Sequence, residues 1–138
     1  RAMPATPLHA AEEKRLLAIA RRIRERILAV VYESGSGHVG TALSQTDVLV
    51  ALYYRTLRID SARPQDADRD RFVLSKGHGG LGLAPILADR GFISDEALQT
   101  FGRTGSALGM HMDHRKVPGI EVSTGSWDMV WASPWAGR

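Results

Sequence analysis

The sequence predicts a single helix-rich domain with one strand candidate. The first observation is an apolar stripe from about Ala11 to Glu33, where large apolar residues recur every three or four positions, as on one face of a helix. The second is a short apolar run at Phe72–Ser75, which is a strand candidate. The third is the length, because 138 residues give room for one compact domain with a substantial core.

The other elements follow from turn and capping signals. Ser34 and Gly35 end the first helix. Residues 44–47 (SQTD) have the form of a capping box, which predicts that a second helix begins there and runs through Leu57. The remaining expected elements are a polar surface loop at residues 60–71, a helix at 81–89, a short helix capped by Ser94 and ending near Phe101, and a glycine-rich loop at 102–126.

Composition excludes several classes of protein. With 43% hydrophobic and 24% charged residues, the chain is typical of a globular protein and not of a disordered or fibrous one. It contains no cysteine, which excludes disulfides, thiolate nucleophiles and zinc–thiolate sites. No apolar run approaches the ~18 residues that span a bilayer, and no secretory leader is evident. The expectation is a cytoplasmic protein without a membrane partner.

The net charge of +3 and the arginines between Arg15 and Arg26 raise the alternative of a small basic module that binds nucleic acid. Glu12, Glu13 and Glu25 lie in the same stretch, and no aromatic residue alternates with the arginines to stack on bases. A solvated face of an amphipathic helix is therefore the favoured interpretation, and nucleic acid is not expected as a partner.

Histidines gather in the irregular segments. His38, His78, His111 and His114 lie in expected loops, and His38 and His78 are flanked by glycines. Glycine lets a backbone approach a ligand closely, and main-chain N–H groups can then bind phosphate oxygens. A neighbouring histidine can donate a hydrogen bond or transfer a proton near neutral pH. A polyanion pocket lined by histidines is therefore the favoured interpretation.

Two other kinds of site compete with this pocket. Residues 35–40 match the dinucleotide-binding pattern G-x-G-x-x-G, but that motif requires a preceding strand and here a long helix precedes it. His111, Asp113 and His114 with a fourth ligand could form a metal site, although their expected position in a loop supplies no regular geometry for it.

Three ordered motifs carry a family resemblance: SGHVG at residues 36–40, DRFVLSKGHG at 70–79 and VPGIEVSTGS at 117–126. Together they resemble the transketolase family, in particular the N-terminal diphosphate-binding part of split transketolases. The resemblance implies a three-layer α/β/α fold with a mostly parallel sheet. This chain would supply only its N-terminal part, which is helix-rich with one or two strands.

The resemblance also implies an enzyme that uses thiamine diphosphate and Mg²⁺ to transfer a two-carbon ketol unit between sugar phosphates. It implies catalytic roles for His38 and His111, and cofactor-binding roles for His78, His111, Gly125 and Ser126. The motifs depart from the family after His38, where Val39-Gly40-Thr41 replaces Pro-Gly-Gly, and around His111, where methionines replace the flanking glycine and proline. These departures affect the sugar substrate, and another thiamine-diphosphate reaction is the alternative within enzymes.

The resemblance further implies a C-terminal transketolase subunit or domain as partner, and an oligomer with its active site between chains. The family's magnesium ligands, a Gly-Asp-Gly motif and a later Asn, do not occur in this sequence. The isolated chain is therefore expected to be an inactive fragment that binds the cofactor weakly or not at all.

Residues 127–138 depart from the family altogether and contain all three tryptophans. Residues 127–132 (WDMVWA) require the codons TGG-GAY-ATG-GTN-TGG-GCN. Starting one base earlier gives NTG-GGA-YAT-GGT-NTG-GGC, which encodes an apolar residue followed by Gly-His-Gly-Leu-Gly or a close variant, as the family continues. The expectation is a domain part at residues 1–126 and a frameshifted tail at 127–138.

Overall fold

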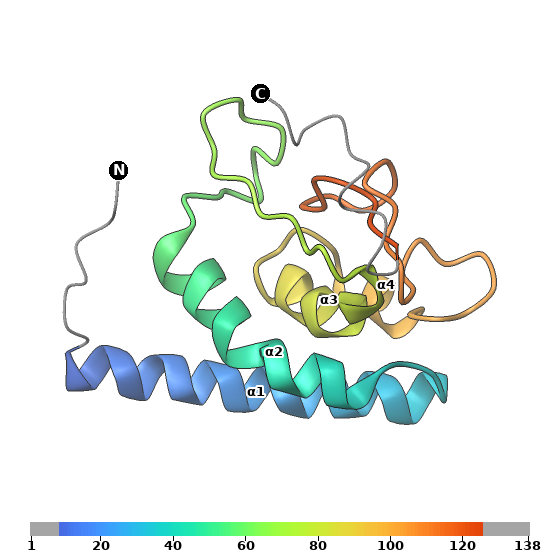
Figure 1. Ribbon diagram of the computed structural model, residues 1–138, viewed down its shortest axis with the longest axis horizontal. Coiled ribbons are helices and arrows are strands. Elements are labelled where there is room, and N and C mark those ends of the chain that lie inside the picture. Colours follow the sequence, from blue (N-terminus) through green and yellow to red (C-terminus); the bar gives the residue numbers. More distant parts are fainter. Residues whose placement is uncertain (1–8, 126–138) are drawn as a thin grey trace.

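The computed structural model describes residues 9–125, which form four α-helices, one π-helical segment and one 3-10 turn. The α-helices are α1 (Ala10–Ser34), α2 (Val39–Ala51), α3 (Gly80–Asp89) and α4 (Asp95–Gln99), the π-helical segment is η1 (Leu52–Thr56), and the 3-10 turn is η2 (Gly77–Gly79). In Figure 1, α1 spans the longest dimension of the molecule, and α2, α3 and α4 pack against it. None of these helices is long and apolar enough to cross a membrane.

The amphipathic helix predicted at the start of the chain is confirmed. The buried face of α1 consists of Ile19, Ala20, Ile23, Ile27 and Val30. The helix ends at Gly35, whose φ of 63° lies in the left-handed region that glycine adopts without strain. The Gly35 N–H donates to the carbonyl oxygen of Val31 at 2.8 Å and closes the last turn.

The predicted start of the second helix is wrong. α2 begins at Val39, and the supposed capping box lies inside it. The hydroxyls of Ser44 and Thr46 donate to the carbonyl oxygens of Thr41 and Ala42, both at 3.0 Å, so they bond backward along a helix that is already formed. Within this tetrad, Gln45 and Thr46 are buried residues of α2, which packs against α3.

The later elements agree with expectation. α3 begins one residue before the predicted helix and ends at the same residue, and residues 60–71 form turns and loop. Ser94 caps α4, because its hydroxyl oxygen accepts a hydrogen bond from the Ala97 N–H at 3.1 Å.

The expectation of one or two strands is wrong for residues 9–125, which contain no strand. The alternation in the predicted strand is present, because Phe72 and Leu74 pack against the core while Arg71 and Val73 are exposed. A strand also needs a neighbouring segment with which to share main-chain hydrogen bonds. No described segment pairs with Phe72–Ser75 in this way, so within residues 9–125 the run is not part of a sheet.

The arginines of α1 pair with acidic side chains or donate to a main-chain carbonyl, as expected for the solvated face of an amphipathic helix. Arg21 pairs with Glu25, Arg22 with Asp89, Arg24 with Asp47, and Arg26 with Asp95, while Arg15 donates to the carbonyl oxygen of Tyr54. Burial raises the pKa of Asp89, but the hydrogen bonds from Arg22 and Tyr54 outweigh it and hold that pKa below its ordinary value. Asp89 therefore stays ionised between α1 and η1.

Candidate functional site

Two histidines that lie far apart in the sequence meet at the start of two helices. His38 is the residue that immediately precedes α2, and His78 is the middle residue of η2, which leads directly into α3. Their ring centroids lie 5.5 Å apart with an interplanar angle of 86°, an edge-to-face arrangement. His38 is exposed and His78 is half-buried, so the pair faces outward from the packed ends of α2 and α3.

Glycines allow two further loops to close against this turn. A Cβ atom on Gly77 would lie 2.1 Å from the carbonyl oxygen of Thr124, and one on Gly80 would lie 2.6 Å from that of Met110. The Gly77 N–H also donates to the carbonyl oxygen of Gly125 at 3.0 Å. These contacts are with main-chain oxygen atoms, which cannot move aside as the end of a flexible side chain can. Both positions therefore require glycine. The third predicted motif therefore packs directly against the second.

His111 is held by the same closing loop. Its Nδ1 atom lies 3.2 Å from the carbonyl oxygen of Thr124. A carbonyl oxygen only accepts, so Nδ1 carries a proton in this bond, and in the neutral form of the ring Nε2 is the acceptor. Thr124 is fixed in turn, because its hydroxyl donates to the carbonyl oxygen of Leu74 at 2.6 Å. His111 is exposed, and its ring can meet a ligand with a defined proton position.

The proposed metal cluster at His111, Asp113 and His114 is not supported. Among residues 9–125, no three side chains of His, Asp or Glu are arranged to hold a metal ion. Asp113 instead accepts two hydrogen bonds from the Arg115 side chain, at 3.1 and 2.9 Å, which hold the pKa of its carboxyl well below the ordinary range. His114 is engaged by the hydroxyl of Ser123, which lies 2.9 Å from its Nδ1 atom.

This arrangement brings together most of the residues predicted for the site. His38 and His78 are in contact, and Gly125 is bonded to the residue that precedes His78. His111 joins them through the shared neighbour Thr124. Ser126 lies outside the described residues. The dinucleotide pattern at residues 35–40 does follow a helix, α1, and not the strand that such a motif requires.

The sequence interpretation missed two residues that build this site, Thr124 and Gln45. Gln45 is only 7% exposed, and its Nε2 atom donates to the carbonyl oxygen of Gly79 at 2.7 Å. The spacing of Gly79 and Gly82 is the sequence signal that could have identified Gln45. Because these glycines lack side chains, they leave space beside the start of α3 for a long side chain.

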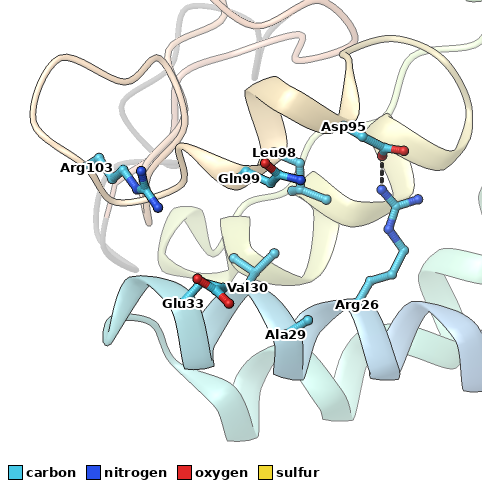
Figure 2. A pocket seen from close by; sticks show the side chains of 8 residues that line it. All are labelled: Arg26, Ala29, Val30, Glu33, Asp95, Leu98, Gln99 and Arg103. Carbon is cyan, nitrogen blue, oxygen red and sulfur yellow. Dashed lines mark hydrogen bonds and ion pairs between the residues drawn. The ribbon is translucent and has the colours of Figure 1, made fainter.

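A separate hollow of about 560 Å³ lies between α1 and α4 (Figure 2). Ala29, Val30 and Leu98 line it together with charged and polar side chains, and the ion pair of Arg26 with Asp95 lies at one end. None of the histidines lines it, so it is distinct from the site formed by the Gly-His loops.

Comparison with known proteins places the chain in a family. Residues 16–129 match the model of the family described as transketolase, thiamine diphosphate binding domain. The chain is 46% identical over 107 residues to the 6-deoxy-6-sulfo-D-fructose transketolase subunit SqwG of Clostridium sp. (strain MSTE9), covering 78% of this chain and 39% of that protein. It is 45% identical over 103 residues to an apulose-4-phosphate transketolase subunit of Phocaeicola vulgatus, covering 75% of this chain and 36% of that protein.

A solved structure supports the same assignment. The transketolase from Leishmania mexicana matches with a TM-score of 0.74 and 31% sequence identity, over 80% of this chain and 17% of that one. The chain thus spans less than two fifths of the length of each of these relatives. The family match includes the loops of His38, His78 and His111 described above. The chain therefore belongs to the transketolase family and represents part of its thiamine-diphosphate-binding domain.

Proposed function

We propose that this protein takes part in the thiamine-diphosphate-dependent transfer of a two-carbon ketol unit between sugar phosphates. The observation that carries the proposal is the convergence of three histidine loops, two of them Gly-His turns, from distant parts of the sequence into one site that lies within the family match. A lone Gly-His turn is commonly structural, whereas three histidine loops that meet at the surface favour a ligand site.

The donor set fits the diphosphate of the cofactor. Glycines at residues 77, 79 and 80 bring the backbone close to the His78 ring, and the turn that they form leads into the N-terminus of α3. Imidazole N–H groups and helix N-termini are both good partners for phosphate oxygens. In the proposal, His78 contacts the diphosphate, His111 contacts the rest of the cofactor, and Gly125 and Ser126 hold it through their backbone.

The proposal gives His38 and His111 the proton transfers. When bound, thiamine diphosphate supplies the electron sink for breaking a carbon–carbon bond next to a carbonyl group. His38 is exposed at the N-terminus of α2, where its ring can contact substrate hydroxyls and move a proton. The Nε2 atom of His111, an acceptor when Nδ1 is bonded to Thr124, is placed to accept a proton from a substrate hydroxyl.

The described residues do not provide a magnesium site. No group of His, Asp or Glu side chains within residues 9–125 is arranged for a cation, and the sequence holds no Gly-Asp-Gly motif. A role for Mg²⁺ would need ligands outside these described residues, and nothing in the roles proposed for the histidines depends on it.

The substrates and partner are also proposals. Two of the relatives are named as transketolase subunits, one for apulose 4-phosphate and one for 6-deoxy-6-sulfo-D-fructose. We propose a sugar phosphate or a similarly anionic sugar as substrate, a second subunit that completes the enzyme, and a cytoplasmic location. The basic charge of +3 is compatible with anionic substrates.

The proposal extends to the last residues of the chain. The family match ends at Met129, and the codons required by residues 127–132 encode an apolar residue, Gly, His or Tyr, Gly, an apolar residue and Gly when read one base earlier. We propose that one base has been lost near the Ser126 codon. Resequencing the coding DNA tests this: an open shifted frame that encodes Gly-Asp-Gly supports it, whereas a shifted frame that closes quickly refutes it.

The activity is tested with the frame restored by one inserted base and the product coexpressed with its partner subunit. The expected result is ketol transfer that requires thiamine diphosphate and falls by about 10²- to 10⁴-fold in His38→Ala, the range typical of a lost acid–base group. A matched control is His9→Ala, an exposed histidine outside the site, which should retain activity. Equal activity with and without the cofactor would contradict the proposal.

A further inference from the structure

We propose that Gln45 is a positioning residue that fixes the rings of His38 and His78 relative to each other. The inference rests on the proposed function for the roles of these histidines, but it is argued from the packing of α2 against α3. His38 immediately precedes α2, and Gln45 lies two helical turns later on the same helix. His78 lies in η2, directly before α3.

One side-chain hydrogen bond connects these two elements. The Nε2 atom of Gln45 donates to the carbonyl oxygen of Gly79 at 2.7 Å. Gly79 directly follows His78 in the chain, and its own N–H donates to the carbonyl oxygen of Lys76 at 2.8 Å, which closes the turn. The amide of Gln45 thus connects the one-turn helix that contains His78 to α2, the helix that begins directly after His38.

Packing as well as a hydrogen bond fixes the side-chain amide of Gln45. A Cβ atom on Gly79 would lie 2.9 Å from the Gln45 Oε1 atom, and one on Gly82 would lie 2.1 Å from its Nε2 atom. The Gln45 side chain occupies the space that these two glycines leave on the start of α3. With only 7% of the residue exposed, it has little room for another rotamer, so its length and direction set the separation of the two elements.

The polar groups of Gln45 indicate that its side chain does more than fill the space between α2 and α3: it directs a hydrogen bond. The Gln45 Oε1 atom is buried without a hydrogen-bond partner among the described residues. A buried unpaired acceptor is unfavourable for folding, and an apolar side chain of the same length would fill the space without it. The feature that such a side chain lacks is the N–H donor aimed at the Gly79 carbonyl, next to His78.

The variant that isolates this donor is Gln45→Met, which keeps the length of the side chain and removes both polar groups. The matched control is Thr46→Val, because Thr46 is fully buried on the same helix but its hydroxyl bonds only to Ala42 within α2. The first readout is the NMR nuclear Overhauser effect between the ring protons of His38 and His78 in the full 138-residue chain. It is expected in the wild type and in Thr46→Val, and lost in Gln45→Met.

The second readout is turnover in the restored two-subunit enzyme. A misplacement of about 1 Å can cost on the order of 10²-fold in rate, so kcat of Gln45→Met should fall about 10- to 100-fold with KM nearly unchanged. Thr46→Val should stay within about twofold of wild type. Loss of the ring contact together with a fall in kcat supports the proposal. A preserved ring contact overturns it, and so does a lost contact with unchanged kcat.

A measurement on the wild type guards against a variant that does not fold. The side-chain N–H protons of Gln45 should exchange slowly with solvent and show scalar coupling across the hydrogen bond to the Gly79 carbonyl carbon. Rapid exchange in the folded chain would overturn the proposal. Neither this result nor the ring contact depends on transketolase activity, so failure of the proposed function and failure of this inference are distinguishable.

Discussion

Replacing Gly77 with alanine tests whether the closing loop packs on the His78 turn as described. The added Cβ atom would lie 2.1 Å from the Thr124 carbonyl oxygen, 2.5 Å from its carbon and 2.9 Å from the Gly125 carbonyl oxygen. All three contacts are with backbone, so no flexible side-chain end can turn aside. The segment at residues 124–125 must therefore move away from the turn.

The size of the effect follows from two contributions. Overpacking a tight site typically costs about 1–3 kcal/mol, and this cost is counted once for the added Cβ atom. Displacing the loop also breaks the hydrogen bond from the Gly77 N–H to the Gly125 carbonyl oxygen, which adds roughly 0.5–1.5 kcal/mol. We expect Gly77→Ala to lower the free energy of unfolding by about 2–4 kcal/mol.

The assay is urea unfolding followed by circular dichroism, with Gly40→Ala as the matched control. A Cβ atom on Gly40 meets nothing within 4 Å, and Gly40 lies in the first turn of α2. Removing a helical glycine should stabilise the chain by up to about 1 kcal/mol. If Gly77→Ala were as stable as Gly40→Ala, the packing of the loop on this turn would be refuted.

Three further substitutions test other contacts. Thr124→Val removes the hydroxyl bond to a main-chain carbonyl, and urea unfolding should show a loss of about 1 kcal/mol; an unchanged midpoint would contradict this role. Arg69→Met leaves the nearly buried Glu121 without its main partner at 2.9 Å, so the same assay should show a loss of about 3 kcal/mol; a gain in stability would contradict it. For Asp89, the lowered pKa means that its ionised form adds stability above the unfolded pKa of about 3.9, and that this contribution is lost as the pH falls through the lower folded value. Asp89→Asn should therefore cost about 2 kcal/mol at pH 7, and its difference from wild type should shrink below about pH 4; a difference independent of pH would refute the argument.

Local patterns predicted the helices well where the signal was a repeating apolar face or a single capping residue. The stripe of α1 and the Ser94 cap of α4 are properties of adjacent residues, and both are confirmed. The start of α2 was misjudged, because a hydroxyl that caps a helix and one that bonds back to an earlier carbonyl have the same sequence signature.

The strand could not be predicted from its own residues. The alternation of Phe72 and Leu74 with exposed neighbours reports which side faces the core, and this part is confirmed. Whether such a segment forms a strand depends on a partner elsewhere in the chain, and residues 9–125 supply none.

The histidine loops were predictable as a group, because glycine beside histidine is a chemical signal as well as a conformational one. The contact of His38 with His78 brings two of these loops together, and the polyanion pocket that the signal predicted stays a prediction. Gln45 was not identified, since its role depends on Gly79 of η2 and Gly82 of α3, which only the fold brings beside it, and the spacing of these glycines was the signal available in the sequence.

The most direct test of the central claim is an NMR titration of the chain with inorganic pyrophosphate, following the histidine rings. His9 is exposed and lies outside the site, so it reports nonspecific effects, and sulfate at equal ionic strength controls for charge. If the Gly-His loops form a diphosphate site, the His78 ring signals shift saturably with pyrophosphate while those of His9 do not. Parallel shifts of His78 and His9, or an equal response to sulfate, would contradict the assignment.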